Sequence, residues 1–576
     1  MLYSKLTQRS LLKGFIALIL LGSITSSTYA TPDIIPTNNS NEQSTPININ
    51  LLNRHVINNR AAYIPAQCYT KTRSSDNKIH NPCFSCHTQG LAPNYIDDSS
   101  FQIEYDFRTY SRTNRWTNLF KDRTSDVAKI SDEAILSYIK TSNYFNQNGE
   151  ILLSKQLKSL PKSWDVNQDG KWNGYTPDCY FNFDNEGFDK TPNNKDSGWR
   201  AFAYTPFLGT FWPTNGSTDD VIIRLPENMR KDQSSQYSRD VYKVNLAIVE
   251  AMITRKNVTI EPQDETLFGV DLNRNGILDI ASQITYEWIP TQGKNMSYVG
   301  LAKNLQEQGK LNLAAGLYPE GTEFLHTVRY IDFDDNKAIT LSKRIKEIRY
   351  AKKTSWNKYS QLYNAAQGEA LETRNFPDRL RRFVGNSETG LINGLGWTYQ
   401  GFIEDTQGFL RPQSFEETMN CIGCHSGIGV TTDSSFAFPR KLNAHNHQAG
   451  WYHWTQKGIQ GIAEPKYNNG TWQYTEYLLN NRSANEFRNN HEVIAKFYEK
   501  DGSLKPKEID RLHKDISHLL QPSTERAIQL NKAYKVIVDE QSYIYGRDPH
   551  IKPVTTSWDI VPIDEKTGIE NPILHN

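Results

Sequence analysis

The sequence predicts a mainly α-helical, multi-domain protein with extensive irregular loops and minor β structure. Its 576 residues are more than one ordinary domain needs. Apolar residues recur at helical spacing over 131–141, 240–255, 341–373 and parts of 484–541. Proline, glycine and asparagine are frequent between these stretches, which is typical of loops. We therefore expect helices that are joined by long irregular segments.

Three helices are predicted before residue 400. Ser131 is a favourable N-cap for a helix over 131–141. Residues 240–255 place their apolar side chains on one helical face. The basic stretch 341–373 is interpreted as a long helix whose charged side faces solvent. Docking of a partner on that charged side is the alternative.

Helix signals continue to the C-terminal region. The capping-box sequence Ser414–Glu417 opens a predicted helix, because its first and last side chains can bond each other's backbone. Three further helices are predicted over 484–500, 507–520 and 523–541, and Pro522 and the N-cap Ser523 separate the last two. The tail beyond residue 547 is expected to be irregular.

The N-terminal segment predicts export. Basic residues precede a mainly apolar stretch over 11–21, and Thr28-Tyr29-Ala30 is a suitable cleavage site. This is the pattern of a secretory signal peptide over 1–30, with an uncleaved anchor as the alternative. Residues 31–50 are rich in Asn, Pro, Ser and Thr and are predicted to be a flexible leader. We expect a periplasmic or secreted protein with no membrane span after cleavage.

Charge excludes some classes of partner. The chain has 65 Lys and Arg residues against 64 Asp and Glu residues. A nearly neutral balance gives no indication of nucleic acid or an anionic membrane as the partner.

Two five-residue motifs, called pentads below, carry the chemistry. They are Cys83–His87 and Cys421–His425, and both read Cys-x-x-Cys-His. This spacing is typical of c-type haem attachment, in which two thiols bond one porphyrin and the histidine binds its iron. A redox dithiol or half of a Cys₄ zinc site is the alternative for each motif. The predicted residues are Cys83, Cys86, Cys421 and Cys424 for attachment of two haems, and His87 and His425 as axial ligands.

The sixth iron ligands are less well defined by the sequence. No methionine follows the second pentad, so a local His/Met site is not expected there. We expect one of His445, His447 and His453 to be the distal ligand or acid–base group of the second haem. The alternative is that all three are ordinary hydrogen-bonding or surface residues. Candidates near the first haem are His55, His80 and His326, and Met229 or Met252 is the alternative if a tertiary contact brings it near.

Two cysteines lie outside the pentads. They are Cys68 and Cys179, and an oxidising compartment favours a disulfide between them. In the chain-entropy model such a bond would contribute up to about 4–5 kcal/mol. Two separate buried thiols are the alternative.

Two short loops resemble calcium-binding loops of extracellular proteins. Oxygen-bearing side chains occur at positions 1, 3, 5 and 9, with glycine at position 6, but neither loop has glutamate at position 12. The predicted calcium residues are Asp165, Asn167, Asp169 and Asn173 in the first loop, and Asp271, Asn273, Asn275 and Asp279 in the second.

These features divide the chain into five predicted segments. The signal peptide and leader precede a first haem segment over 51–160, a middle region over 161–410 and a second haem segment over 411–576. The middle region contains both calcium-type loops and long helices. The second haem segment contains the C-terminal helices.

On its pentads and signal peptide, the chain resembles large exported, multi-domain di-haem cytochromes c. The resemblance implies electron transfer through two covalent haems and a redox partner protein. A di-haem oxidoreductase of the peroxidase or oxygenase kind, with one open haem, is the alternative. The spacing does not match that of known di-haem peroxidases, so no catalytic residue is assigned. A calcium-stabilised binding protein with structural haems is the third hypothesis.

Overall fold

The computed structural model describes residue 51 and residues 57–210, 212–482 and 488–574. Contacts divide the chain into two compact units, and all described residues belong to the second, residues 46–576. The predicted signal peptide, the leader and His55 lie outside the described residues.

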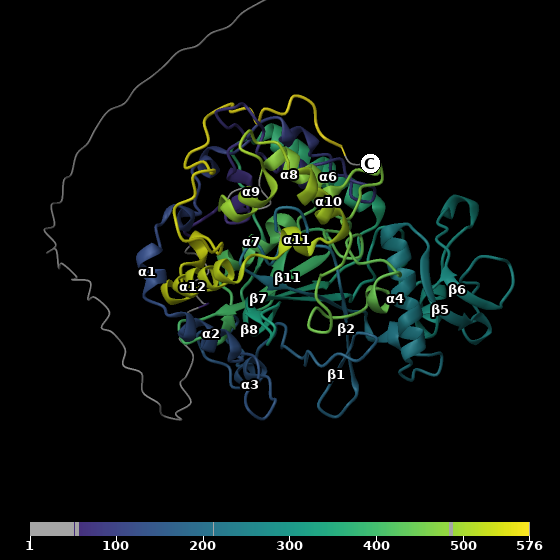
Figure 1. Cartoon of the computed structure of the whole chain (residues 1–576). Coiled ribbons are helices and arrows are strands. Elements are labelled where there is room, and N and C mark those ends of the chain that lie inside the picture. The colour runs from purple at the N-terminus through teal and green to yellow at the C-terminus, as the bar shows by residue number, and fades with distance from the viewer. Residues whose placement is uncertain (1–50, 52–56, 211, 483–487, 575–576) are drawn as a thin grey trace, which may run out of the picture. The chain divides into compact units, whose positions relative to one another are not determined.

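A large antiparallel sheet is the centre of the fold (Figure 1). Its strand order is β1-β2-β4-β7-β8-β11-β10-β9, with β12 on β11 and β3 on β7. A separate two-stranded sheet pairs β5 with β6 and lies beside α4. The strands are β1 Phe188–Lys190, β2 Asp196–Phe202, β3 Thr218–Asp219, β4 Val221–Arg224, β5 Val258–Asp264, β6 Ile280–Ile284, β7 Glu323–Phe333, β8 Ile339–Lys353, β9 Val384–Asn386, β10 Gly390–Ile392, β11 Trp397–Glu404 and β12 Leu410–Pro412.

The prediction of a mainly α-helical cytochrome with minor β structure is wrong, because the fold is mixed α/β with a ten-stranded sheet. The largest error is the helix expected over 341–373, where the structure has β8 and then α6. A β-bulge explains the misleading pattern. Val328 pairs with Glu347 and Arg329 with Ile345, so Lys346 is an extra residue in β8. The bulge puts Ile345 and Ile348 on one face at a spacing of three, which imitates a helix.

The helices are distributed around this sheet. They are α1 Thr124–Ala128, α2 Asp132–Lys140, α3 Leu152–Lys158, α4 Arg239–Thr254, α5 Leu301–Glu307, α6 Tyr359–Asn375, α7 Phe415–Cys424, α8 Gln473–Asn481, α9 His491–Phe497, α10 Pro506–Lys514, α11 Ser517–Leu520 and α12 Thr524–Glu540. The helices predicted from caps are confirmed, since Ser131, Ser414 and Ser523 cap α2, α7 and α12. The stretch 507–520 forms two helices, and α9 occupies only part of 484–500.

The two faces of the sheet have different roles. Leu325, Ile345 and Ile348 pack with Trp164 and Trp199 in a hydrophobic cluster that also includes α3. Figure 1 shows α3 on one side of the sheet and α7 on the other. The opposite side chains of β7, β8 and β11 form the floor of a cavity, described next. Among the described helices, none is long and apolar enough to cross a bilayer.

Candidate functional site

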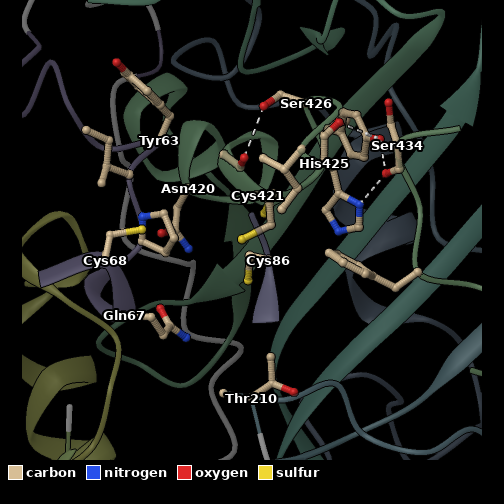
Figure 2. A pocket seen from close by; sticks show the side chains of 18 of the residues that line it. Tyr63, Gln67, Cys68, Cys86, Thr210, Asn420, Cys421, His425, Ser426 and Ser434 are labelled. Carbon is tan, nitrogen blue, oxygen red and sulfur yellow. Dashed lines mark hydrogen bonds between the residues drawn. The ribbon is translucent and has the colours of Figure 1, made fainter. Parts of the chain in front are cut away.

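Both pentads line one cavity of about 960 Å³. Cys83 and Cys86 reach it from the N-terminal part of the chain, and Cys421 and Cys424 reach it from the end of α7. Figure 2 shows the side chains of Cys68, Cys86 and Cys421 in the same space. The volume is at the upper end of the range for cofactor and ligand pockets. The structure therefore brings together two motifs that are far apart in the sequence.

The first pentad is held in a tight turn. Cys83–Ser85 form one turn of 3₁₀ helix, and the Cys83 N–H donates to Oδ1 of Asn81 at 2.7 Å. The His87 ring follows the turn, and its Nδ1 lies 2.9 Å from Oδ2 of Asp98. A carboxylate at this distance fixes the ring and leaves Nε2 for another partner.

The second pentad lies at the C-terminal end of α7. Arg411 anchors the start of that helix through two 2.9 Å bonds to the buried carboxylate of Glu417. After the helix ends, Nδ1 of His425 lies 2.8 Å from the carbonyl oxygen of Ser434 (Figure 2). Burial lowers the pKa of His425 to about 4, so its imidazole is neutral at neutral pH. A neutral ring with one nitrogen held is suited to binding a metal through the other nitrogen.

The first pentad is in direct backbone contact with the segment that follows the second pentad. The N–H of Val430, which follows the second pentad, donates to the Cys86 carbonyl at 3.2 Å. The neighbouring Gly429 N–H lies 3.2 Å from both oxygens of Asp98, the carboxylate that holds His87. A methyl group at Gly429 would lie 1.7 Å from the Thr88 carbonyl oxygen, so only glycine permits this approach. The pentads therefore form one structural unit.

The thiols of the pentads are protonated in this arrangement. Burial raises the pKa of Cys83 to about 12 and that of Cys424 to about 11. In the described part of the chain, no three His, Cys, Asp or Glu side chains converge as a metal-binding group.

Several buried polar atoms on the cavity wall have no hydrogen-bond partner. They are Ser85 Oγ, Trp397 Nε1, Ser434 Oγ, Tyr534 Oη and Arg547 Nε. These atoms lie within the wall rather than on its accessible surface, because each of them is itself buried.

The floor of the cavity combines apolar side chains of β7 and β11 with the charged Glu347 and Arg349 of β8. On β7, His326 lies between Phe324 and Val328, and it pairs with Arg349 of β8. Nε2 of His326 is 3.3 Å from Oδ2 of Asp219 on β3. The sequence indicates His326 only as a further candidate near the first haem, because the strand pairing that places it on this floor joins distant segments.

The structure places none of the three predicted distal histidines on the cavity wall. His445 and His447 are exposed. His453 is buried, but its ring nitrogens lie 2.8 Å from Asp220 and Thr455, which leaves neither free. The geometry therefore favours the alternative, in which these three histidines are ordinary hydrogen-bonding or surface residues.

The predicted Cys68–Cys179 disulfide is not formed. Both cysteines are free thiols. Cys68 lines the cavity, whereas Cys179 is buried with Tyr144 and Trp199 in the cluster on the other face of the sheet. The sheet separates the two residues, which the sequence could not show.

The two calcium-type loops share one unexpected feature. In the first, Glu388 accepts hydrogen bonds from the N–H groups of Val166 and Asn173 at 2.8 and 3.0 Å. In the second, Glu265 accepts from Leu272 and Asp279 at 2.6 and 3.0 Å. Both glutamates are buried and lie outside the loop sequences. Calcium binding stays a prediction for both loops.

Comparison with known proteins gives a family. A family described as "-like lipoprotein" matches residues 52–509. An uncharacterized lipoprotein of Aquifex aeolicus (strain VF5) is 30% identical, over 88% of this chain and 89% of the relative. The chain belongs to this lipoprotein family. The expected membership of a di-haem cytochrome c family is therefore wrong, because that resemblance rested on ten motif residues and a signal peptide.

Membership of the lipoprotein family agrees with the export predicted from the N-terminal segment. No solved structure matches the chain.

Proposed function

We propose that this lipoprotein-family member is an exported redox protein that carries two covalently attached haems in one cavity and transfers electrons through them. The observation that carries the proposal is the joint cavity, in which both Cys-x-x-Cys-His pentads meet. The 3.2 Å hydrogen bond from Val430 to Cys86 means that two attached porphyrins would be neighbours.

The residues of the cavity are compatible with this cofactor. Each pentad supplies two thiols for the vinyl groups of one porphyrin and one histidine for its iron. In both cases Nδ1 of the histidine is already held, by Asp98 or by the Ser434 carbonyl. Arg108, Arg381 and Arg382 also line the cavity, and guanidinium groups pair well with carboxylates such as those of a porphyrin. When bound, such a group supplies one-electron chemistry at iron.

The protein's own residues would set the properties of each haem. Asp98 places a full negative charge beside His87, whereas Ser434 offers His425 only a neutral carbonyl. A carboxylate makes its histidine a stronger electron donor to iron than a carbonyl does. The two sites are therefore expected to differ in reduction potential, with the first haem lower.

A periplasmic location and a protein redox partner belong to the same proposal. Covalent haem attachment of this type takes place outside the bacterial cytoplasm, which fits the predicted export. Cell fractionation tests the location, because a periplasmic protein is released with the soluble periplasmic fraction.

Mass spectrometry of the exported protein tests haem attachment. The expected product carries the added mass of two porphyrins, and a Cys83→Ser/Cys86→Ser variant carries one. Cys179→Ser is the matched control, because that thiol lies behind the sheet, and it should keep both. An exported, folded chain without added mass would overturn the proposal.

One observation favours the oxidoreductase alternative, with one open haem. Among the described residues that line the cavity, the only imidazoles are His87, His326 and His425, and no methionine is present. If each of two irons had two histidine or methionine ligands, four such side chains would be required. With three, one iron would keep an open position. Azide titration of the oxidised protein distinguishes the cases, since an open haem gives a saturable spectral change and a closed pair does not.

A further inference from the structure

Each of the three imidazoles among the described residues of the cavity wall has one ring nitrogen near an oxygen atom. Nδ1 is hydrogen-bonded in His87, to Asp98 at 2.9 Å, and in His425, to Ser434 at 2.8 Å, whereas Nε2 of His326 lies 3.3 Å from Asp219 without hydrogen-bond geometry. Histidines that bind metals are typically prepared in this way, because the held nitrogen fixes the ring and makes the other a better donor. The arrangement of His326 is similar, because Asp219 is near Nε2 and Nδ1 is left for a metal.

The position of His326 associates it with the second pentad. The ring of His425 lies 5.4 Å, centroid to centroid, from the ring of Tyr399 on β11, which pairs with Ala351 of β8. Ala351 pairs in turn with Phe324, which lies two residues before His326 on the same face of β7. His326 lies on the cavity floor, which the sheet forms, whereas His425 follows α7. The two imidazoles therefore reach the cavity from different walls.

A purely structural role accounts poorly for this residue. Nε2 of His326 is buried, yet it lacks a well-formed hydrogen bond. The same Asp219 carboxylate already accepts a hydrogen bond from the Tyr204 hydroxyl. Phe324 and Val328 are the apolar neighbours of His326 along β7, and the charged Arg349 lies opposite it on β8. A buried imidazole nitrogen without a hydrogen bond is a costly structural element, whereas a ring that lines the cavity suits an iron ligand.

We propose that His326 is the sixth ligand of the iron in the second haem, and that Asp219 positions it. This inference rests on the proposed function, since it needs a haem attached to the second pentad. The sixth ligand would come from the central sheet rather than from the His445–His453 stretch.

The test is the spin state of the exported, haem-loaded protein. In His326→Ala we expect one low-spin signal in the EPR spectrum to be replaced by a high-spin signal, with two porphyrins still attached by mass. Added imidazole should restore the low-spin signal, because it can fill the space of the missing side chain. His445→Ala is the matched control, since that ring is exposed, and its spectrum should equal that of the parent.

Two further variants test whether His326 binds the second haem and whether Asp219 positions it. In the Cys83→Ser/Cys86→Ser background only the second haem remains, and His326→Ala should still convert it from low to high spin. Asp219→Asn should keep it low-spin but raise its reduction potential, because a less basic ligand stabilises Fe(III) less.

The outcomes separate this inference from the proposed function. Absence of porphyrin from the parent protein overturns both. Two porphyrins with a low-spin spectrum that His326→Ala leaves unchanged overturn only the ligand assignment, as does conversion of the first haem instead of the second. A His326→Ala protein that fails to accumulate is replaced by His326→Gln, which keeps a polar side chain and is expected to give the same high-spin signal.

Discussion

Asp98 holds Nδ1 of His87 at 2.9 Å and accepts the backbone N–H of Gly429 at 3.2 Å. One carboxylate thus joins the imidazole of the first pentad to the segment that follows the second. It is buried, so its charge acts on the ring with little screening. Asp98 is therefore placed to influence both the chemistry of the first site and the contact between the two.

Replacing Asp98 by Asn tests this double role. The amide oxygen can still accept one hydrogen bond, but the negative charge beside His87 is lost. We expect a higher reduction potential for the first haem with both porphyrins retained, measured by a spectroscopic redox titration. Asp97→Asn is the control, because that carboxylate is exposed. Equal potentials in parent and Asp98→Asn would show that the carboxylate does not tune the site.

The close backbone approach at Gly429 predicts a large steric effect. In Gly429→Ala the new methyl group would meet the Thr88 carbonyl oxygen at 1.7 Å, and the pentads would have to separate. We expect unfolding in urea to show a loss of about 3 kcal/mol or more. Gly368→Ala in α6 is the matched control, since nothing lies within 4 Å of its added methyl group. That change should stabilise the helix by about 0.5–1 kcal/mol.

Calcium should stabilise the protein if the two Asp/Asn loops bind it. A site filled at a hundred times its Kd adds about 2.7 kcal/mol to the free energy of unfolding. We expect calcium to raise the Tm of the parent and a chelator to lower it. Asp165→Asn with Asp271→Asn should remove this response, because each loop loses the charge at its first position. Asp334→Asn, in an exposed turn, should keep it. A parent Tm that is indifferent to calcium would argue for purely structural loops.

Glu464 predicts a specific pH dependence. Burial raises the pKa of this carboxyl from its ordinary 4.5 to about 7, although it accepts hydrogen bonds from Thr475. The folded state therefore keeps a proton that the unfolded state loses between about pH 4.5 and 7. The contribution of Glu464 to stability is complete below pH 4.5 and is lost as the pH rises through 7.

Urea unfolding at a series of pH values checks this sign. Glu464→Gln keeps the shape of the side chain but cannot ionise. Between pH 4.5 and 7 the free energy of unfolding of the parent should therefore fall relative to that of the variant. Glu499→Gln, an exposed change, should follow the parent at every pH. If the free energy of unfolding depended on pH in the same way in the parent and in Glu464→Gln, the raised pKa of Glu464 would be contradicted.

Local features were predictable from the sequence. The capping serines Ser131, Ser414 and Ser523 were recognised because a cap depends on residues three positions apart. The pentads were recognised for the same reason. The helix over 341–353 was wrong because the bulge at Lys346 gives strand β8 the apolar spacing of a helix, and the pairing with β7 that reveals it involves a separate segment.

The sequence by itself determined the chemistry available to this protein: two thiol pairs, each followed by a histidine, behind an export signal. Only the tertiary structure decided that both pairs share one cavity, that Asp98 and Ser434 hold the two rings, and that His326 faces the same space. The physical reason is that these contacts join segments distant in the chain. Local spacing carries no record of them, whereas burial and sheet pairing bring them together.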